Sequence, residues 1–350
     1  MIILKMCIIC TNNYLTTLTT LNCNSCTNIL SIPNTLIHLK YLNCANTNIT
    51  KLPNTLVNMV YLNCSNTKIE IIPSSFKNLT YLFCSKTNIN ILPLVYNIKQ
   101  LDCSYNNIHF IPKSYSKLEM LSCNNTKLYR LSNTFKKLKI LNCANCNITI
   151  LPPNYYHLLY LNCNNNNIYM IPNKYKSLVN LKCKNNNIRY ISYRLYNLNY
   201  LDISYNDISN ICEFYSKLIY LNISNTLITN IPDTYINLSK LECYNTKLEF
   251  LPLSLTKLKI IKPKNYMNLH INDYIQYIHN NKIPNNVKTY INDKIGSCSI
   301  CLTNLSNKNY SNISIIKKCN HYFHKACLFE WFGSKLNCPN CRIELLKKKI

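Results

Sequence analysis

Leucine returns along the chain at intervals of about 20 residues, with one-residue slips near the N-terminal end. A unit reads approximately L-x-C-x-x-[N/T]-x-I-x-x-[I/L]-P, and apolar and polar residues alternate around the leucine, which predicts a short strand. One such unit is too small to bury its apolar edge alone, so the units are expected to stack. The twelve leucines are Leu21, Leu42, Leu62, Leu82, Leu101, Leu121, Leu141, Leu161, Leu181, Leu201, Leu221 and Leu241.

Proline occupies an equivalent place in most units, several residues after the leucine. Because proline inside a helix costs about 3 kcal/mol, a helical return path is excluded, and the 20-residue period excludes a heptad coiled coil. Each unit is therefore expected to contain a short strand, a turn and an extended or 3₁₀ return path. The prolines are Pro53, Pro73, Pro93, Pro112, Pro152, Pro172, Pro232 and Pro252.

The repeated pattern resembles the short variety of leucine-rich repeat, over about residues 18–262. The resemblance implies a solenoid of 20-residue repeats over residues 1–262, with parallel strands on the concave face. The family's polar ladder position holds Asn, Thr or Cys here, each able to donate a hydrogen bond to buried carbonyls of the neighbouring coil. These residues are Thr47, Thr67, Thr87, Asn106, Thr126, Cys146, Asn166, Asn186, Asn206, Thr226 and Thr246.

A column of cysteines fills the second inward position of the strands, and Ile203 or Ile223 replaces it in two units. A position that accepts cysteine or isoleucine needs a small apolar side chain, so these cysteines are predicted to be core. Cys7, Cys10, Cys23 and Cys26 have the spacing of a zinc ribbon, which leaves an extra metal site open. The column is Cys23, Cys44, Cys64, Cys84, Cys103, Cys123, Cys143, Cys163, Cys183 and Cys243.

Side chains alternate across a strand, so the residue before each leucine faces outward. This column is rich in tyrosine, and asparagine is frequent two residues further on. Exposed tyrosine beside amide groups suits protein recognition, so we expect this concave face to bind an unidentified protein substrate. The tyrosines are Tyr41, Tyr61, Tyr81, Tyr160, Tyr200 and Tyr220.

The chain has a formal net charge of +26 at pH 7 and 2 glycines. So few glycines exclude a phosphate-binding glycine loop, and with it most nucleotide-dependent enzymes. The lysines are scattered, as AT-rich coding would produce, so a nucleic-acid partner is not expected. A basic patch around Lys182, Lys184 and Arg189 nevertheless leaves phosphate binding open.

No stretch approaches the roughly 18 apolar residues of a membrane span, and Met1–Cys10 lacks a signal-peptide cleavage site. We expect no membrane partner and an intracellular, cytoplasmic location (the host cytoplasm if the chain is viral). Residues 263–294 are expected to form a C-terminal cap and a linker. The cap would be a short helix with Ile271, Tyr274, Ile275 and Ile278 on one face.

Residues 295–345 contain eight candidate metal ligands in the order C-x2-C-x17-C-x-H-x2-H-x2-C-x10-C-x2-C. Zinc prefers four sulfur or imidazole ligands in a tetrahedron, so eight ligands predict two ions. With every position filled by protein, both ions would be structural. The ligands are Cys298, Cys301, Cys319, His321, His324, Cys327, Cys338 and Cys341.

This segment resembles the RING finger in its variant with two central histidines. The resemblance implies a small zinc-bound α+β domain with interleaved ligands. Cys298, Cys301, His324 and Cys327 would hold one zinc, and Cys319, His321, Cys338 and Cys341 the other. Sequential pairing into two separate fingers stays open as the alternative.

RING fingers of the ligase kind dock a ubiquitin-conjugating enzyme charged with ubiquitin in an apolar groove. By resemblance, Ile300, Trp331 and Pro339 form this groove, and Arg342 contacts both ubiquitin and the conjugating enzyme. The implied function is a RING-type ubiquitin transferase that recruits its substrate through the repeats, with no catalytic residue of its own. The alternative is a non-catalytic adaptor or scaffold with a structural RING.

Overall fold

The computed structural model describes residues 16–248, 251–252, 254–258, 260–262, 313–316 and 321–324. The chain divides into two compact units, Met1–Tyr266 and Met267–Ile350, and each is described by itself. The expected cap and linker at residues 263–294 lie outside the described residues, so these domain limits stay predictions.

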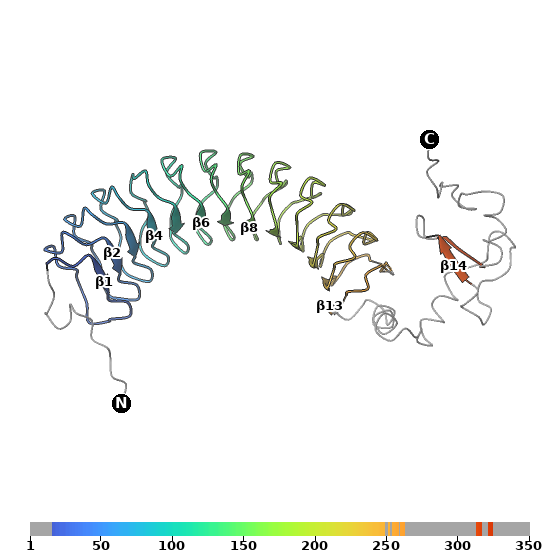
Figure 1. The fold of residues 1–350 in the computed structure, drawn as a ribbon, viewed down its shortest axis with the longest axis horizontal. Helices are drawn as coiled ribbons and strands as arrows, with labels where there is room; N and C mark the ends of the chain where they lie inside the picture. Colours follow the sequence, from blue (N-terminus) through green and yellow to red (C-terminus); the bar gives the residue numbers. More distant parts are fainter. Residues whose placement is uncertain are drawn as a thin grey trace, which may run out of the picture. The chain divides into compact units, whose positions relative to one another are not determined.

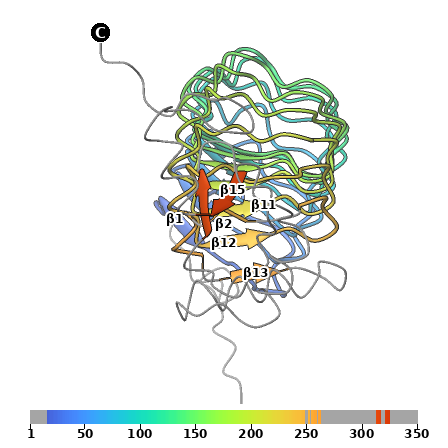
Figure 2. The same cartoon turned by 90° about the vertical axis from the view of Figure 1, so that its right-hand side faces the viewer.

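Thirteen parallel strands form one continuous sheet in the first unit, in the order of the chain. Figure 1 shows them on the inner side of an arc, and Figure 2 shows successive coils overlying one another. This confirms the predicted solenoid. The strands are β1 (Thr20–Asn22), β2 (Tyr41–Asn43), β3 (Tyr61–Asn63), β4 (Tyr81–Phe83), β5 (Gln100–Asp102), β6 (Met120–Ser122), β7 (Ile140–Asn142), β8 (Tyr160–Asn162), β9 (Asn180–Lys182), β10 (Tyr200–Asp202), β11 (Tyr220–Asn222), β12 (Lys240–Glu242) and β13 (Ile260–Lys262).

The strands are in exact register because equivalent residues of successive repeats pair. Leu42 lies opposite Leu62, and Leu141 lies opposite Leu161. The last strand pairs Ile261 with Leu241, so isoleucine takes the leucine position there. The leucine count in the sequence therefore gave twelve units, one fewer than the strands of the sheet.

The core lies between the sheet and the return path. Leu42 and Cys44 are fully buried. Tyr41, the outward-facing residue before Leu42 in the same strand, is 46% exposed. Every member of the predicted cysteine column is buried, and Ile203 and Ile223 are buried in the same column. The prediction that these thiols act as small apolar side chains is confirmed.

The ladder position joins neighbouring coils by hydrogen bonds. The Asn166 amide donates to the carbonyl oxygen of Cys163 at 3.0 Å, in its own coil, and to that of Cys143 at 2.9 Å, in the preceding coil. The Asn166 side-chain oxygen also accepts from the Ile148 backbone N–H at 3.0 Å. Thr47 donates only to Cys44 of its own coil, at 2.7 Å. Asparagine therefore satisfies buried backbone groups of two coils, and threonine those of one.

The residue before the ladder position adopts a left-handed conformation, as at Asn46 with φ 56°. Asparagine tolerates this conformation better than most residues, which explains its abundance in a chain with almost no glycine. Lys86, Tyr105 and Tyr205 take the same conformation in their coils.

The return path consists of consecutive turns. In the coil after β1, the Leu36 N–H donates to the Pro33 carbonyl at 3.4 Å and the Leu39 N–H to the Leu36 carbonyl at 3.0 Å. These are 3₁₀-type bonds, but within residues 16–248 no continuous 3₁₀ helix forms. The return path is therefore a series of single 3₁₀-type turns joined by extended residues, in line with the prediction.

Buried tyrosines add a second set of bonds between coils, which the sequence analysis missed. The Tyr175 hydroxyl donates to the Pro152 carbonyl at 2.6 Å, and the Tyr115 hydroxyl to the Pro93 carbonyl at 2.7 Å. Both side chains are fully buried. The recurring spacing P-x-x-Y at Pro112 and Pro172 is the sequence signal for this column.

We expect Asn166→Ala to destabilise the solenoid by about 2–4 kcal/mol, because it leaves several buried backbone groups without partners. Asn167→Ala, at an exposed position of the same coil, should change stability little. Urea denaturation followed by circular dichroism measures both. Equal stability of the two variants would contradict the role assigned to the ladder.

Candidate functional site

The tyrosines predicted on the concave face fall into two groups. Tyr41, Tyr61 and Tyr81 begin the adjacent strands β2, β3 and β4, with ring centroids 6.4 Å and 6.3 Å apart. Phe83 extends this group, 5.5 Å from the Tyr61 ring. Tyr160, Tyr200 and Tyr220 begin β8, β10 and β11. The tyrosine column is interrupted at β5–β7, where Gln100, Met120 and Ile140 occupy it, and at β9, where Asn180 does.

The second group is a stack of rings and cations. The Tyr200 and Tyr220 rings are 4.1 Å apart and almost parallel, at 8°. The Lys182 ammonium lies 5.3 Å from the centroid of Tyr200 and 5.8 Å from that of Tyr160. The Lys240 ammonium lies 4.7 Å from the centroid of Tyr220. Each contact has cation–π geometry.

The environment of Tyr220 is set by burial and by its neighbours. Desolvation raises the pKa of Tyr220 well above its ordinary value, and the hydroxyl of Tyr200 and the carboxylates of Glu242 and Asp202 raise it further. The phenol therefore keeps its proton at physiological pH.

Two acidic side chains at or beside the concave strands form ion pairs. Glu119 lies 2.9 Å from Lys139, and Glu242 lies 3.1 Å from Lys240. Asp202 is buried and accepts from the Ser204 hydroxyl at 2.7 Å. Hydrogen bonding to Lys139 lowers the pKa of Glu119. Within the described solenoid, Lys182 forms no ion pair, although Asp202 lies opposite it on the adjacent strand.

The thiols of the strand cysteine column are poor nucleophiles, whereas hydrogen bonds led by that with Cys123 lower the pKa of the buried ladder cysteine Cys146 to about 6. Burial raises the pKa of Cys64, Cys84 and Cys163 well above the ordinary thiol value, so these thiols stay protonated. The described residues contain no group of three or more His, Cys, Asp or Glu side chains able to hold a metal. The alternative zinc site at the N-terminal end includes Cys7 and Cys10, which lie outside the described residues.

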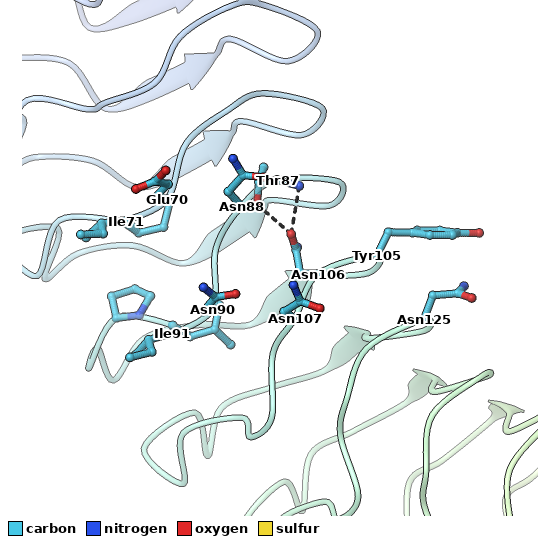
Figure 3. Close-up of a pocket in the computed structure, with 13 residues that line it drawn as sticks. Glu70, Ile71, Thr87, Asn88, Asn90, Ile91, Tyr105, Asn106, Asn107 and Asn125 are labelled. Carbon is cyan, nitrogen blue, oxygen red and sulfur yellow. Dashed lines mark hydrogen bonds between the residues drawn. The ribbon is translucent and has the colours of Figure 1, made fainter.

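A groove of about 1040 Å³ opens on the flank of the solenoid, where the chain leaves the strands. In Figure 3, Ile71 and Ile91 lie on one side of it, and Tyr105 and Asn125 on the other. Its floor includes Asn106, whose side-chain oxygen accepts from the Thr87 N–H at 2.9 Å. The lining contains Glu70 as its one acid and no cysteine or histidine, so it offers a binding surface without catalytic groups.

In the second unit, the structure describes a hairpin of β14 (Ile313–Ile316) and β15 (His321–His324). The strands are antiparallel, with Ile316 opposite His321 and Ile313 opposite His324. Because strand residues alternate between two faces, positions 321 and 324 belong to opposite faces of the hairpin.

The other residues predicted for this region lie outside the described residues. They are the ligands Cys298, Cys301, Cys319, Cys327, Cys338 and Cys341, the groove residues Ile300, Trp331 and Pro339, and Arg342. Chemically, six thiols and two imidazoles form a donor set that suits zinc, and a segment of about fifty residues has little core without metal.

Comparison with known families decides the nature of this segment. Residues 296–342 match the family described as Ring finger domain. The C-terminal segment is a RING-H2 finger domain. A RING finger domain binds zinc, in agreement with the donor set of this segment.

The RING-H2 region is similar to plant proteins. RING-H2 finger protein ATL80 of Arabidopsis thaliana is 38% identical over 50 residues, which cover 14% of this chain and 24% of that protein. The probable E3 ubiquitin-protein ligase ATL45 of the same plant is 39% identical over 57 residues, 16% of this chain and 28% of that protein. The curated matches span from 8% to 30% of their proteins' lengths, so they concern the RING region alone.

The solenoid is similar to solved leucine-rich-repeat structures. An LRR protein of Leptospira interrogans superposes with a TM-score of 0.62 at 23% identity, covering 68% of this chain and 70% of that one. A domain of InlJ from Listeria monocytogenes, described as including a cysteine ladder, gives 0.57 at 25% identity, covering 74% and 57%. The fold of the first unit is thus a leucine-rich-repeat solenoid, with a RING-H2 domain after it. Among the described residues, no helix has the length and apolar character needed to cross a membrane.

The raised pKa values lead to a prediction for thiol reactivity. At pH 8, iodoacetamide should leave Cys84, Cys103 and Cys163 unmodified in the native chain, because burial keeps these thiols protonated and inaccessible. The same residues should react in urea, as mapped by peptide mass spectrometry. Rapid native modification of Cys103 would contradict the packed cysteine column.

Proposed function

We propose that this chain is a RING-type ubiquitin ligase that recruits a protein substrate through its leucine-rich repeats. The match of residues 296–342 to the RING finger family carries the proposal, together with similarity to proteins named E3 ubiquitin ligases. The reaction would transfer ubiquitin from the thioester of a conjugating enzyme to a lysine of the substrate. No residue of this chain would form a covalent intermediate.

The RING would hold two zinc ions in crossed fashion. Cys298, Cys301, His324 and Cys327 form one site, and Cys319, His321, Cys338 and Cys341 the other. The match of residues 296–342 to the RING finger family supports this division, because the resemblance implies interleaved ligands. Bound zinc supplies folding free energy, on the order of 10 kcal/mol per site, and no open coordination position.

The conjugating enzyme would dock in an apolar groove made by Ile300, Trp331 and Pro339. Arg342, directly after the last ligand, would donate hydrogen bonds to both ubiquitin and the conjugating enzyme. These contacts hold the charged enzyme in one orientation, so that the thioester is accessible to a lysine amine. Rate enhancement would come from orientation and proximity.

The solenoid would raise the local concentration of a substrate near the charged conjugating enzyme. Its concave face supports this role, because the two tyrosine groups offer large aromatic surfaces that lose little side-chain entropy on binding. The face presents Tyr41, Tyr61, Tyr81, Tyr160, Tyr200 and Tyr220.

Zinc content tests the crossed ligand sets. The native chain should contain two equivalents of zinc by plasma mass spectrometry. Cys301→Ser with Cys327→Ser removes two ligands of one site and should leave about one equivalent. Cys301→Ser with Cys319→Ser damages both sites and should leave none. Sequential ligation predicts the opposite zinc contents: none for the first double variant and about one equivalent for the second. Cys212→Ser in the solenoid is the control and should keep two equivalents.

Discharge of ubiquitin from a charged conjugating enzyme tests the ligase activity. Ile300→Ala should abolish discharge, because it removes part of the docking groove, and Arg342→Ala should reduce it by about tenfold or more. Ile150→Ala and Arg130→Ala make the same changes at solenoid positions and should leave discharge intact. Native activity in both RING variants would contradict the docking groove assigned here, whereas no discharge by the native chain would favour the adaptor alternative.

A further inference from the structure

The stack of Lys182, Tyr200, Tyr220 and Lys240 occupies the concave face over β9–β12. The strand order places Lys182 and Tyr220 on opposite sides of Tyr200, and Tyr200 and Lys240 on opposite sides of Tyr220. Both faces of each tyrosine ring are therefore covered within the protein, at 4.1–5.3 Å. We call these four residues the lysine–tyrosine stack.

The lysine–tyrosine stack presents positive charge and hydroxyl donors. Neither Lys182 nor Lys184 forms an ion pair among the described residues, and the carboxylate opposite Lys182, Asp202, is buried. Lys184 lies 5.0 Å from the Tyr205 ring. Glu242 is paired with Lys240, and Asp202 is buried against Ser204. A ligand would therefore meet donors and cations here, while the carboxylates of the same face are already satisfied.

A peptide with carboxylate side chains fits this surface better than a nucleic acid does. Single-stranded nucleic acids bind by stacking bases on open aromatic faces. The ring faces of Tyr200 and Tyr220 are occupied by each other and by the lysines, so a base could not stack there without displacing them. Carboxylates need only the donors that the stack offers.

The charge of this chain argues against the chain itself as the occupant. A second copy is opposed by the charge of the protein, +26 at pH 7. The C-terminal region is also basic and includes Lys347, Lys348 and Lys349, so it would be repelled by the lysines of the stack. Its acidic residues after the solenoid are dispersed as Asp273, Asp293, Glu330 and Glu344.

We propose that the lysine–tyrosine stack binds an extended protein segment rich in Asp and Glu. The proposal deepens the proposed function, on which it rests, by naming the substrate class that the solenoid recruits. Four strands at about 4.8 Å spacing span about 15 Å, the length of four or five extended residues. A segment with two or three carboxylates in that length would reach Lys182, Lys184 and the tyrosine hydroxyls.

Fluorescence anisotropy on the full chain tests this proposal. The probe is a labelled ten-residue peptide of alternating Glu and Ser, and the reference peptide has Gln at every Glu position. The Glu peptide should bind, the Gln peptide should bind at least about tenfold more weakly, and salt should weaken binding. Lys182→Gln with Lys240→Gln should weaken binding of the Glu peptide by about tenfold or more.

Lys174→Gln is the matched control. Lys174 also lies over a tyrosine ring, 5.9 Å from Tyr156, but on the convex turns. The Lys174→Gln variant should bind the Glu peptide as tightly as the native chain does. Equal affinity for the Glu and Gln peptides, or an unaffected double variant, would overturn the proposal.

Two further probes separate other ligands. Tighter binding of a phosphoserine peptide or of an oligothymidylate of equal charge, lost in the double variant, would replace the acidic peptide as the ligand and overturn the proposal. Binding is measured without a conjugating enzyme. A chain that binds the Glu peptide but does not discharge ubiquitin would contradict the proposed function alone, and the converse would contradict this inference alone.

Discussion

Each coil of the solenoid is stable only against its neighbours, because a 20-residue loop cannot satisfy its own inward-facing backbone. The ladder residues supply the missing partners. The Asn166 amide donates to the carbonyls of Cys143 and Cys163, which belong to successive coils. On the return path, the Tyr175 hydroxyl donates to the Pro152 carbonyl of the preceding coil. These bonds fix both the spacing and the register of the coils.

Fixed register has a functional consequence. Because equivalent residues lie side by side, a substitution in one repeat changes one position of a continuous surface and leaves the frame unchanged. The concave face can therefore hold an aromatic group at β2–β4 and a cationic, aromatic group at β9–β12 on the same scaffold. The lysine–tyrosine stack needs residues from four consecutive strands, which only strict register brings together.

Much of this was predictable from the sequence, for physical reasons that differ by position. Buried columns such as Leu42 and Cys44 recur at a fixed spacing because the core admits little else. The proline column excluded helices, but it did not distinguish a 3₁₀ path from isolated turns. The contact of Lys182 with Tyr200 was not readable, because it depends on side-chain conformations across two strands. The RING was readable from its ligand spacing alone, since metal coordination constrains sequence more tightly than packing does.

The central claim is that one chain joins recognition of an acidic segment to ubiquitin transfer. The most direct measurement is reconstituted ubiquitination of a globular protein with and without an appended Glu-rich segment. The native chain should modify the tagged protein far more strongly, and either Ile300→Ala or the paired substitutions at Lys182 and Lys240 should remove that preference. Equal modification of tagged and untagged protein by the native chain would contradict the account.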